Sequence, residues 1–171
     1  PGGLTLKEGD IVGIDLCVSC DGFIGDNAAT FACGSIDPEA QRLLDVTKES
    51  LARGIAAAQA GNRIGDISAA VQLYVEENGF SVIRDFTGHG IGREMNEDPE
   101  VPNYGRAGHG PRLVSGMTIC IEPMSCLGKP TNYIDKDDNW TVKMKDGSIG
   151  CHCEHTVLVT KDGYEVLTLP D

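Results

Sequence analysis

The chain has 171 residues, of which 14 are basic and 26 are acidic, so its formal net charge is −12. This length is enough for one domain with a buried core. The negative charge argues against direct binding to nucleic acid, because phosphate groups would be repelled, and no apolar run reaches the ~18 residues that a membrane-spanning helix needs. We therefore predict one globular domain, 1–171, that binds neither nucleic acid nor a membrane.

Seven cysteines occur at irregular spacings along the chain. An odd number without a recognisable framework favours free thiols in a reducing compartment, so we expect a cytoplasmic protein. The stretches Cys17-x-x-Cys20 and Cys151-His152-Cys153 each have a spacing found in structural zinc sites. Cys17 falls inside a predicted strand, however, so its thiol and that of Cys20 need not face the same way. Structural zinc is therefore the weaker interpretation.

The first predicted element is a β-hairpin. Apolar residues alternate with small or polar ones over Ile11–Ser19, which is the period of a strand, and Asp21-Gly22 is typical of a two-residue hairpin turn. With that turn, Cys17 pairs with Asp26, so Asp15 and Asp26 become diagonal neighbours on one face, roughly 7–8 Å apart at the backbone. A metal between the two carboxylates would remove their repulsion. The alternative is two exposed polar residues on a solvated face.

Two helices and several strands are predicted after the hairpin. Asp37-Pro38 favours a helix start, with an apolar stripe running to Gly61, and Asp66 is expected to cap a second helix that closes at Gly79. Further strands are expected over 80–86, 117–122, 151–160 and 164–169. Because strands and helices do not alternate regularly, we predict an α+β fold with a curved sheet backed by the two helices.

Three further residues are candidates for metal binding. Gly88-His89-Gly90-Ile91-Gly92 lacks the spacing of a dinucleotide-binding loop, and its glycines suit a tight bend that presents the imidazole to a ligand. Glu122 ends an apolar strand before Pro123, and Glu154 opens another. Each has an ordinary explanation, namely a buried histidine or a solvated glutamate. Together with the hairpin aspartates they predict a dinuclear metal site, which usually performs hydrolysis.

Several longer stretches support this interpretation: D-I-V-x-I-D, D-G-F-x-G-D, G-H-G-I-G-R, E-D-P-x-V-P-N-Y, G-M-T-I-C-I-E-P-M, W-T-V-K and E-H-T-V-L-V-T. Along nearly its whole length the chain resembles the type I methionine aminopeptidases, metallopeptidases of the pita-bread fold. Related proline-directed peptidases share the metal ligands but lack I-E-P-M and W-T-V-K. The resemblance implies a curved antiparallel sheet backed by helices with the metal site at its centre. It also implies removal of N-terminal methionine from nascent proteins whose second residue is small.

The resemblance also implies a role for each candidate residue. Asp15 would chelate one ion, His89 and Glu122 would bind the other, and Asp26 and Glu154 would bridge both. Glu122 would in addition transfer a proton between the attacking water and the leaving amine. An oxygen-rich site with one imidazole favours Mn(II), Fe(II) or Co(II). The catalytic residues would be Glu122 and Asn96, and the substrate-binding residues would be Met95, Asn96 and Trp140, although Trp140 could instead belong to the core. We expect a monomer that acts on peptide or nascent-protein N-termini.

The chain departs from the family pattern at three places. Asn96 stands where the family normally has a histidine, and asparagine cannot titrate near neutral pH. Cys151-His152-Cys153 replaces small and amide residues, and a family segment that carries a second histidine and part of the sheet lies upstream of Pro1. We therefore expect a fragment of a longer protein or a natural truncation. The alternatives to catalysis by a methionine aminopeptidase are a non-catalytic pita-bread binding module and a proline-directed peptidase.

Overall fold

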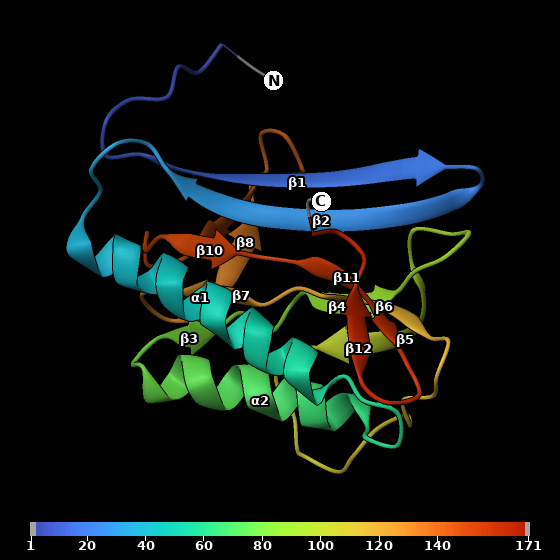
Figure 1. The fold of residues 1–171 in the computed structure, drawn as a ribbon. Coiled ribbons are helices and arrows are strands. Elements are labelled where there is room, and N and C mark those ends of the chain that lie inside the picture. Colours follow the sequence, from blue (N-terminus) through green and yellow to red (C-terminus); the bar gives the residue numbers. More distant parts are fainter. Residues whose placement is uncertain (1–2, 170–171) are drawn as a thin grey trace.

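The computed structural model describes residues 3–169 (Figure 1). Its two helices are α1 (Pro38–Ala57) and α2 (Ile64–Glu77). The strands are β1 (Ile11–Cys20), β2 (Phe23–Ala32), β3 (Ser81–Val82), β4 (Thr87–Gly90), β5 (Glu97–Pro102), β6 (Thr118–Ile121), β7 (Met124–Cys126), β8 (Asn132–Ile134), β9 (Val142–Met144), β10 (Gly150–His152), β11 (His155–Val159) and β12 (Tyr164–Val166).

The β1–β2 hairpin has the predicted register. Cys17 pairs with Asp26 and Asp15 pairs with Ala28, and both turn residues, Asp21 and Gly22, have positive φ, as this hairpin turn requires. The diagonal placement of Asp15 and Asp26 on one face is therefore confirmed.

The hairpin is joined to the rest of the molecule along β2. The backbone N–H of Glu154 donates to the carbonyl of Ala28 at 2.7 Å. Two residues away on each chain segment, the Thr30 hydroxyl donates to the carbonyl of His152 at 2.8 Å and accepts from its N–H at 3.1 Å. Strand β2 thus runs antiparallel to the segment that carries Glu154. The hairpin therefore extends the sheet across the site.

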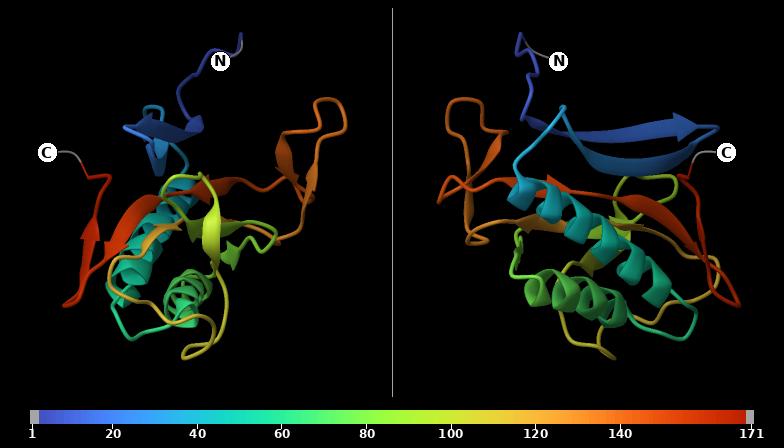
Figure 2. Two further views of the ribbon diagram at one scale, coloured as in Figure 1. Left: turned by 90° about the vertical axis from the view of Figure 1, so that its right-hand side faces the viewer. Right: turned by 60° about the vertical axis from the view of Figure 1, so that its left-hand side comes forward.

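The remaining strands form the other part of this curved, antiparallel layer. One sheet has the order β12-β11-β6-β4-β5 and another the order β10-β7-β3. Strand β6 leads directly into β7, and β10 leads directly into β11, so two connections join the one sheet to the other. The helices α1 and α2 lie side by side on the opposite side of these strands from the β1–β2 hairpin (Figures 1 and 2). The predicted α+β architecture, with an antiparallel sheet backed by two helices, is confirmed.

The core lies between the helices and the strands. Many of its fully buried side chains come from α1, α2, β6 and β11: Leu43, Ile67, Val71, Val75, Ile119, Ile121, Val157 and Val159. No helix within residues 3–169 combines the length and the apolar character needed to cross a membrane. Within that range β1 pairs only with β2, so its outer edge carries no neighbouring strand, and Leu16 and Val18 are exposed.

Several predicted boundaries were wrong. Helix α1 begins after Asp37 as expected, but ends at Ala57 rather than near Gly61. Helix α2 begins before Asp66, whose carboxylate accepts a hydrogen bond from the backbone N–H of Arg63 at 2.7 Å inside the first turn. The predicted strand 80–86 reduces to β3. The predicted strand 151–160 is interrupted at Cys153-Glu154, which turns the glutamate into the site.

Candidate metal centre

A cavity of about 1400 Å³ opens between the hairpin, β4, the end of β6 and the β8–β9 arm. Its lining includes every residue that the sequence predicted for the site: Asp15, Asp26, His89, Met95, Asn96, Glu122, Trp140 and Glu154. These residues come from segments that span most of the chain. The fold therefore brings the candidate metal-binding and substrate-binding residues to one place.

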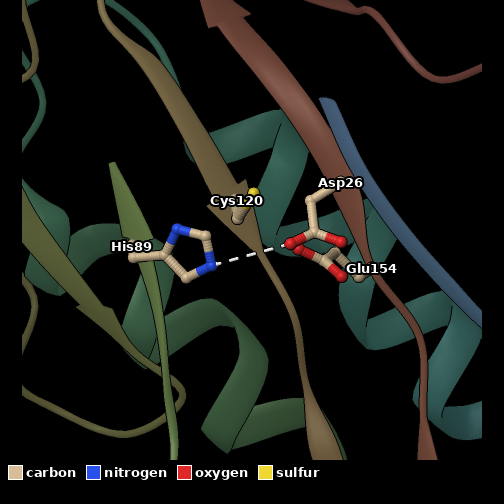
Figure 3. A group of neighbouring side chains, drawn as sticks. All are labelled: Asp26, His89, Cys120 and Glu154. Carbon is tan, nitrogen blue, oxygen red and sulfur yellow. Dashed lines mark ion pairs between the residues drawn. The ribbon is translucent and has the colours of Figure 1, made fainter. Parts of the chain in front are cut away.

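The donor atoms of three side chains that line this cavity gather with the thiol of Cys120. Single donor atoms of Asp26, His89, Cys120 and Glu154 all lie within 4.8 Å of one another. Figure 3 shows these four side chains together. The His89 Nε2 atom is 4.0 Å from Oδ2 of Asp26 and 3.5 Å from Oε1 of Glu122. These separations exceed those of ordinary hydrogen bonds. They suit donors that share a cation.

His89 lies within strand β4, where the register of pairing with β5 shifts between Gly88 and Gly90, rather than in a turn. The glycines on either side are needed because neighbouring strands approach closely. A Cβ atom at Gly88 would overlap the carbonyl oxygen of Cys120 on β6, and one at Gly90 would overlap the carbonyl of Asp98 on β5. The ring of His89 is oriented by a 2.9 Å contact between Nδ1 and the Gly90 carbonyl. Donation from Nδ1–H leaves the Nε2 lone pair free for a metal ion.

Two buried carboxylate oxygens of the site lack hydrogen-bond partners among the described residues. Asp26, Glu122 and Glu154 are buried, and the two oxygens are Oδ1 of Asp26 and Oε1 of Glu154. Burial, together with the charges of Glu122 and Asp26, raises the pKa of Glu154 to about 8. Burial also raises the pKa of Asp15. Unpaired, buried carboxylate oxygens are costly without a cation, so the donor set fits divalent metal.

Three residues that sequence reasoning did not assign to the metal site also contact it. Cys120 precedes Glu122 by two residues, a spacing that could have indicated a shared strand face. The thiol of Cys17 donates to Oδ2 of Asp26 at 2.7 Å, and burial and this bond raise its pKa to about 12. The Nε2 atom of His152 lies 3.4 Å from Oε2 of Glu122. All seven cysteines are free, in agreement with the sequence.

The candidate substrate-binding residues lie at the rim of the cavity. Met95 is 46% exposed and Trp140 is 85% exposed. A core role for Trp140 is therefore excluded. Its indole belongs to the arm formed by β8 and β9, whose Tyr133, Ile134 and Val142 add apolar surface to the same wall. Figure 2 shows this arm projecting from the body of the molecule.

Comparison with known proteins places this geometry in a family. Residues 1–161 match metallopeptidase family M24. The chain belongs to this family. It is 52% identical over 171 residues to the methionine aminopeptidase of Clostridium perfringens, covering 99% of this chain and 68% of that protein. It is 44% identical over 169 residues to methionine aminopeptidase 1 of Bacillus subtilis, covering 98% of this chain and 67% of that protein.

Solved structures of the M24 family agree with the fold. The crystal structure of methionine aminopeptidase from Rickettsia prowazekii superposes with a TM-score of 0.96 at 43% identity, over 99% of this chain and 68% of that one. The prolidase from Pyrococcus furiosus gives a TM-score of 0.75 at 26% identity, over 97% of this chain and 43% of that one. The chain thus spans about two thirds of the length of the methionine aminopeptidases that it matches. Its similarity to them exceeds its similarity to this prolidase.

Proposed function

We propose that the chain provides the catalytic centre of a methionine aminopeptidase, which removes N-terminal methionine from peptides and nascent proteins with a small second residue. One observation carries the proposal. Asp15, Asp26, His89, Glu122 and Glu154 line one cavity in a chain that is 52% identical to a methionine aminopeptidase. Four carboxylates and an imidazole form a donor set for hard or intermediate divalent cations.

The proposed centre holds two ions, Mn(II), Fe(II) or Co(II). Asp15 would bind one ion, His89 and Glu122 would bind the other, and Asp26 and Glu154 would bridge both. When bound, such ions lower the pKa of a shared water and stabilise the oxyanion that forms at the peptide carbonyl. The orphaned oxygens of Asp26 and Glu154 support the bridging role, because each has an oxygen atom to spare for a second ion.

The protein side chains would handle the proton and the substrate. Glu122, with one oxygen 3.5 Å from His89, is the group in the cavity that we assign to proton transfer from the attacking water to the leaving amine. The Asn96 amide would donate a hydrogen bond near the scissile bond. Met95 and Trp140, both exposed at the cavity rim, would contact the methionine side chain through polarizable, apolar surface.

The cellular setting is also part of the proposal. Free cysteines suit the reducing cytoplasm, where nascent N-termini are the available substrate. The charge of −12 disfavours direct contact with nucleic acid. We also propose that the protein acts as a monomer and does not bind a membrane.

A second candidate is a binding module that keeps the fold and the metal but not efficient catalysis. Asn96 favours this alternative, because the histidine expected at its position could titrate near neutral pH. A third candidate, a proline-directed peptidase, has weaker support, because the prolidase that superposes on the chain is 26% identical, against 52% for a methionine aminopeptidase.

The decisive experiment is hydrolysis of a Met-Ala-Ser peptide by the 171-residue chain, or by any longer polypeptide that contains it, with Mn(II) or Co(II) added. We expect metal-dependent release of methionine and none of this activity in Glu122→Gln, which keeps the shape of the side chain but not its charge. An Ala-Pro dipeptide is the control substrate for the proline-directed alternative. Two bound ions without turnover would support the binding module instead.

A further inference from the structure

We propose that His152, on β10, adds a second imidazole to the metal centre, next to the carboxylate of Glu122. The inference rests on the proposed metal centre. It changes the donor set from one nitrogen to two.

The geometry around Glu122 supports this assignment. The carboxylate of Glu122 lies between two imidazoles. Its Oε1 atom is 3.5 Å from Nε2 of His89, and its Oε2 atom is 3.4 Å from Nε2 of His152. Metal–ligand bonds of about 2.0–2.2 Å place two donors of one ion roughly 3–4 Å apart. Both distances suit such pairs, and both are longer than a direct hydrogen bond.

The Nε2 atom of His152 is also unpartnered. It is buried and has no hydrogen-bond partner among the described residues. A buried ring nitrogen is normally satisfied, because its desolvation is otherwise uncompensated. The same is true of Oδ1 of Asp26 and Oε1 of Glu154. Three polar atoms that are all unpaired around one cavity are best explained by ions that occupy the space between them.

The backbone holds the His152 ring in place. Residue His152 pairs with Met124 in the β10–β7 ladder, and its N–H and C=O both bond to the hydroxyl of Thr30. The charges of Glu122, Glu154 and Asp15 all act on its ring, so the imidazole lies among the carboxylates of the centre.

A nitrogen ligand alters which metals the centre prefers. Imidazole suits Co(II), Ni(II) and Zn(II), whereas a purely carboxylate site suits Mn(II). We therefore expect the wild-type chain to bind Co(II) about 10-fold or more tightly than His152→Gln does, with a smaller difference for Mn(II). Glutamine keeps an N–H donor for Glu122 but removes the imidazole nitrogen, so this variant separates metal binding from simple hydrogen bonding.

The test is proton NMR of the chain titrated with Co(II), together with calorimetry of the same titration. An imidazole bound through Nε2 gives one strongly shifted, solvent-exchangeable signal from its Nδ1–H. We expect two such signals in the fully loaded wild type, one in His152→Gln and one in His89→Gln. The control His109→Gln removes an exposed histidine from a loop and should keep two.

The outcomes distinguish this inference from the proposed function. Two signals in both wild type and His152→Gln, or one signal in the wild type, would overturn the role of His152 while leaving the metal centre intact. A wild-type chain that binds no Co(II) would overturn the metal centre itself. If His152→Gln failed to fold, ¹⁵N-histidine labelling of the wild type with Zn(II) would decide, since two metal-shifted Nε2 resonances are expected and one would contradict the assignment.

Discussion

The hydroxyl of Thr156 binds both backbone groups of Asp26, accepting from its N–H at 3.0 Å and donating to its C=O at 2.8 Å. Thr156 is buried and lies two residues after Glu154, on β11. This side chain, together with the Glu154 N–H bond to the Ala28 carbonyl, holds the two carboxylates proposed to bridge the ions at a set separation.

Replacing Thr156 by valine should weaken both stability and metal binding. The backbone N–H and C=O of Asp26 would remain buried without partners, so we expect a loss of about 1–3 kcal/mol in the free energy of unfolding. Urea denaturation of the metal-free chain measures this loss, and calorimetry with Mn(II) should show weaker binding. Thr156→Ser, which keeps the hydroxyl, is the control. Equal stability of the valine and serine variants would contradict the argument.

Strand β4 should not tolerate a side chain at Gly90. A Cβ atom there would overlap the carbonyl of Asp98, so β4 and β5 would have to separate and His89 would move with them. We expect Gly90→Ala to lose about 1–3 kcal/mol of stability, as overpacked sites do, and to bind Mn(II) more weakly. Gly25→Ala is the matched control, because a Cβ atom beside Asp26 on β2 meets nothing within 4 Å. Similar effects of the two substitutions would show that close approach is not the cause.

The metal-free chain should lose stability as pH rises. Burial and neighbouring carboxylates raise the pKa of Glu154 to about 8 in the folded state, against 4.5 in an unperturbed glutamate. The folded state therefore binds this proton more tightly than the unfolded state, and its stabilising effect is complete below about pH 4.5 and lost as pH rises through about 8. The raised pKa of Asp15 has the same sign.

Thermal unfolding of the chelator-treated chain across this pH range measures the effect. Wild type should show a falling Tm, and Glu154→Gln a flatter profile, because the amide has no proton to lose. Saturating Mn(II) should restore the wild-type Tm at pH 8 by supplying the charge that the carboxylates lack. Parallel profiles for wild type and Glu154→Gln would mean that other groups control the pH dependence.

The sequence predicted those parts of the site whose geometry depends only on residues close together in the chain. The Asp21-Gly22 turn sets the register of the hairpin, so the relation between Asp15 and Asp26 follows from two strands alone. The strand that carries His89 could not be predicted in this way, because glycines have low β propensity and β4 exists through its neighbours β5 and β6. His152 was missed for a similar reason. Its place beside Glu122 depends on the packing of β10 against β7 and β2, which are distant in the sequence.

Trp140 should affect substrate binding without affecting stability. Its side chain is 85% exposed, so Trp140→Ala should change the free energy of unfolding by less than about 0.5 kcal/mol. Loss of an apolar contact worth about 1–2 kcal/mol to the substrate methionine should raise KM by roughly 5–30-fold. Steady-state kinetics with Met-Ala-Ser measures this change, and Trp140→Phe should recover most of it. An unchanged KM would remove Trp140 from the substrate pocket.

Asn96 offers the sharpest test of whether catalysis is impaired. It lines the cavity beside Met95, and its amide can donate a hydrogen bond but cannot exchange a proton near neutral pH. A positioned acid–base group typically contributes ~10²–10⁴-fold to a rate, so Asn96→His should raise kcat/KM for Met-Ala-Ser by at least ~10-fold and add an ionisation to its pH profile. Asn96→Ala is the control for simple loss of the amide and should lower kcat/KM. If histidine gave an equal or lower value than asparagine, the amide would have a working role that an imidazole cannot replace.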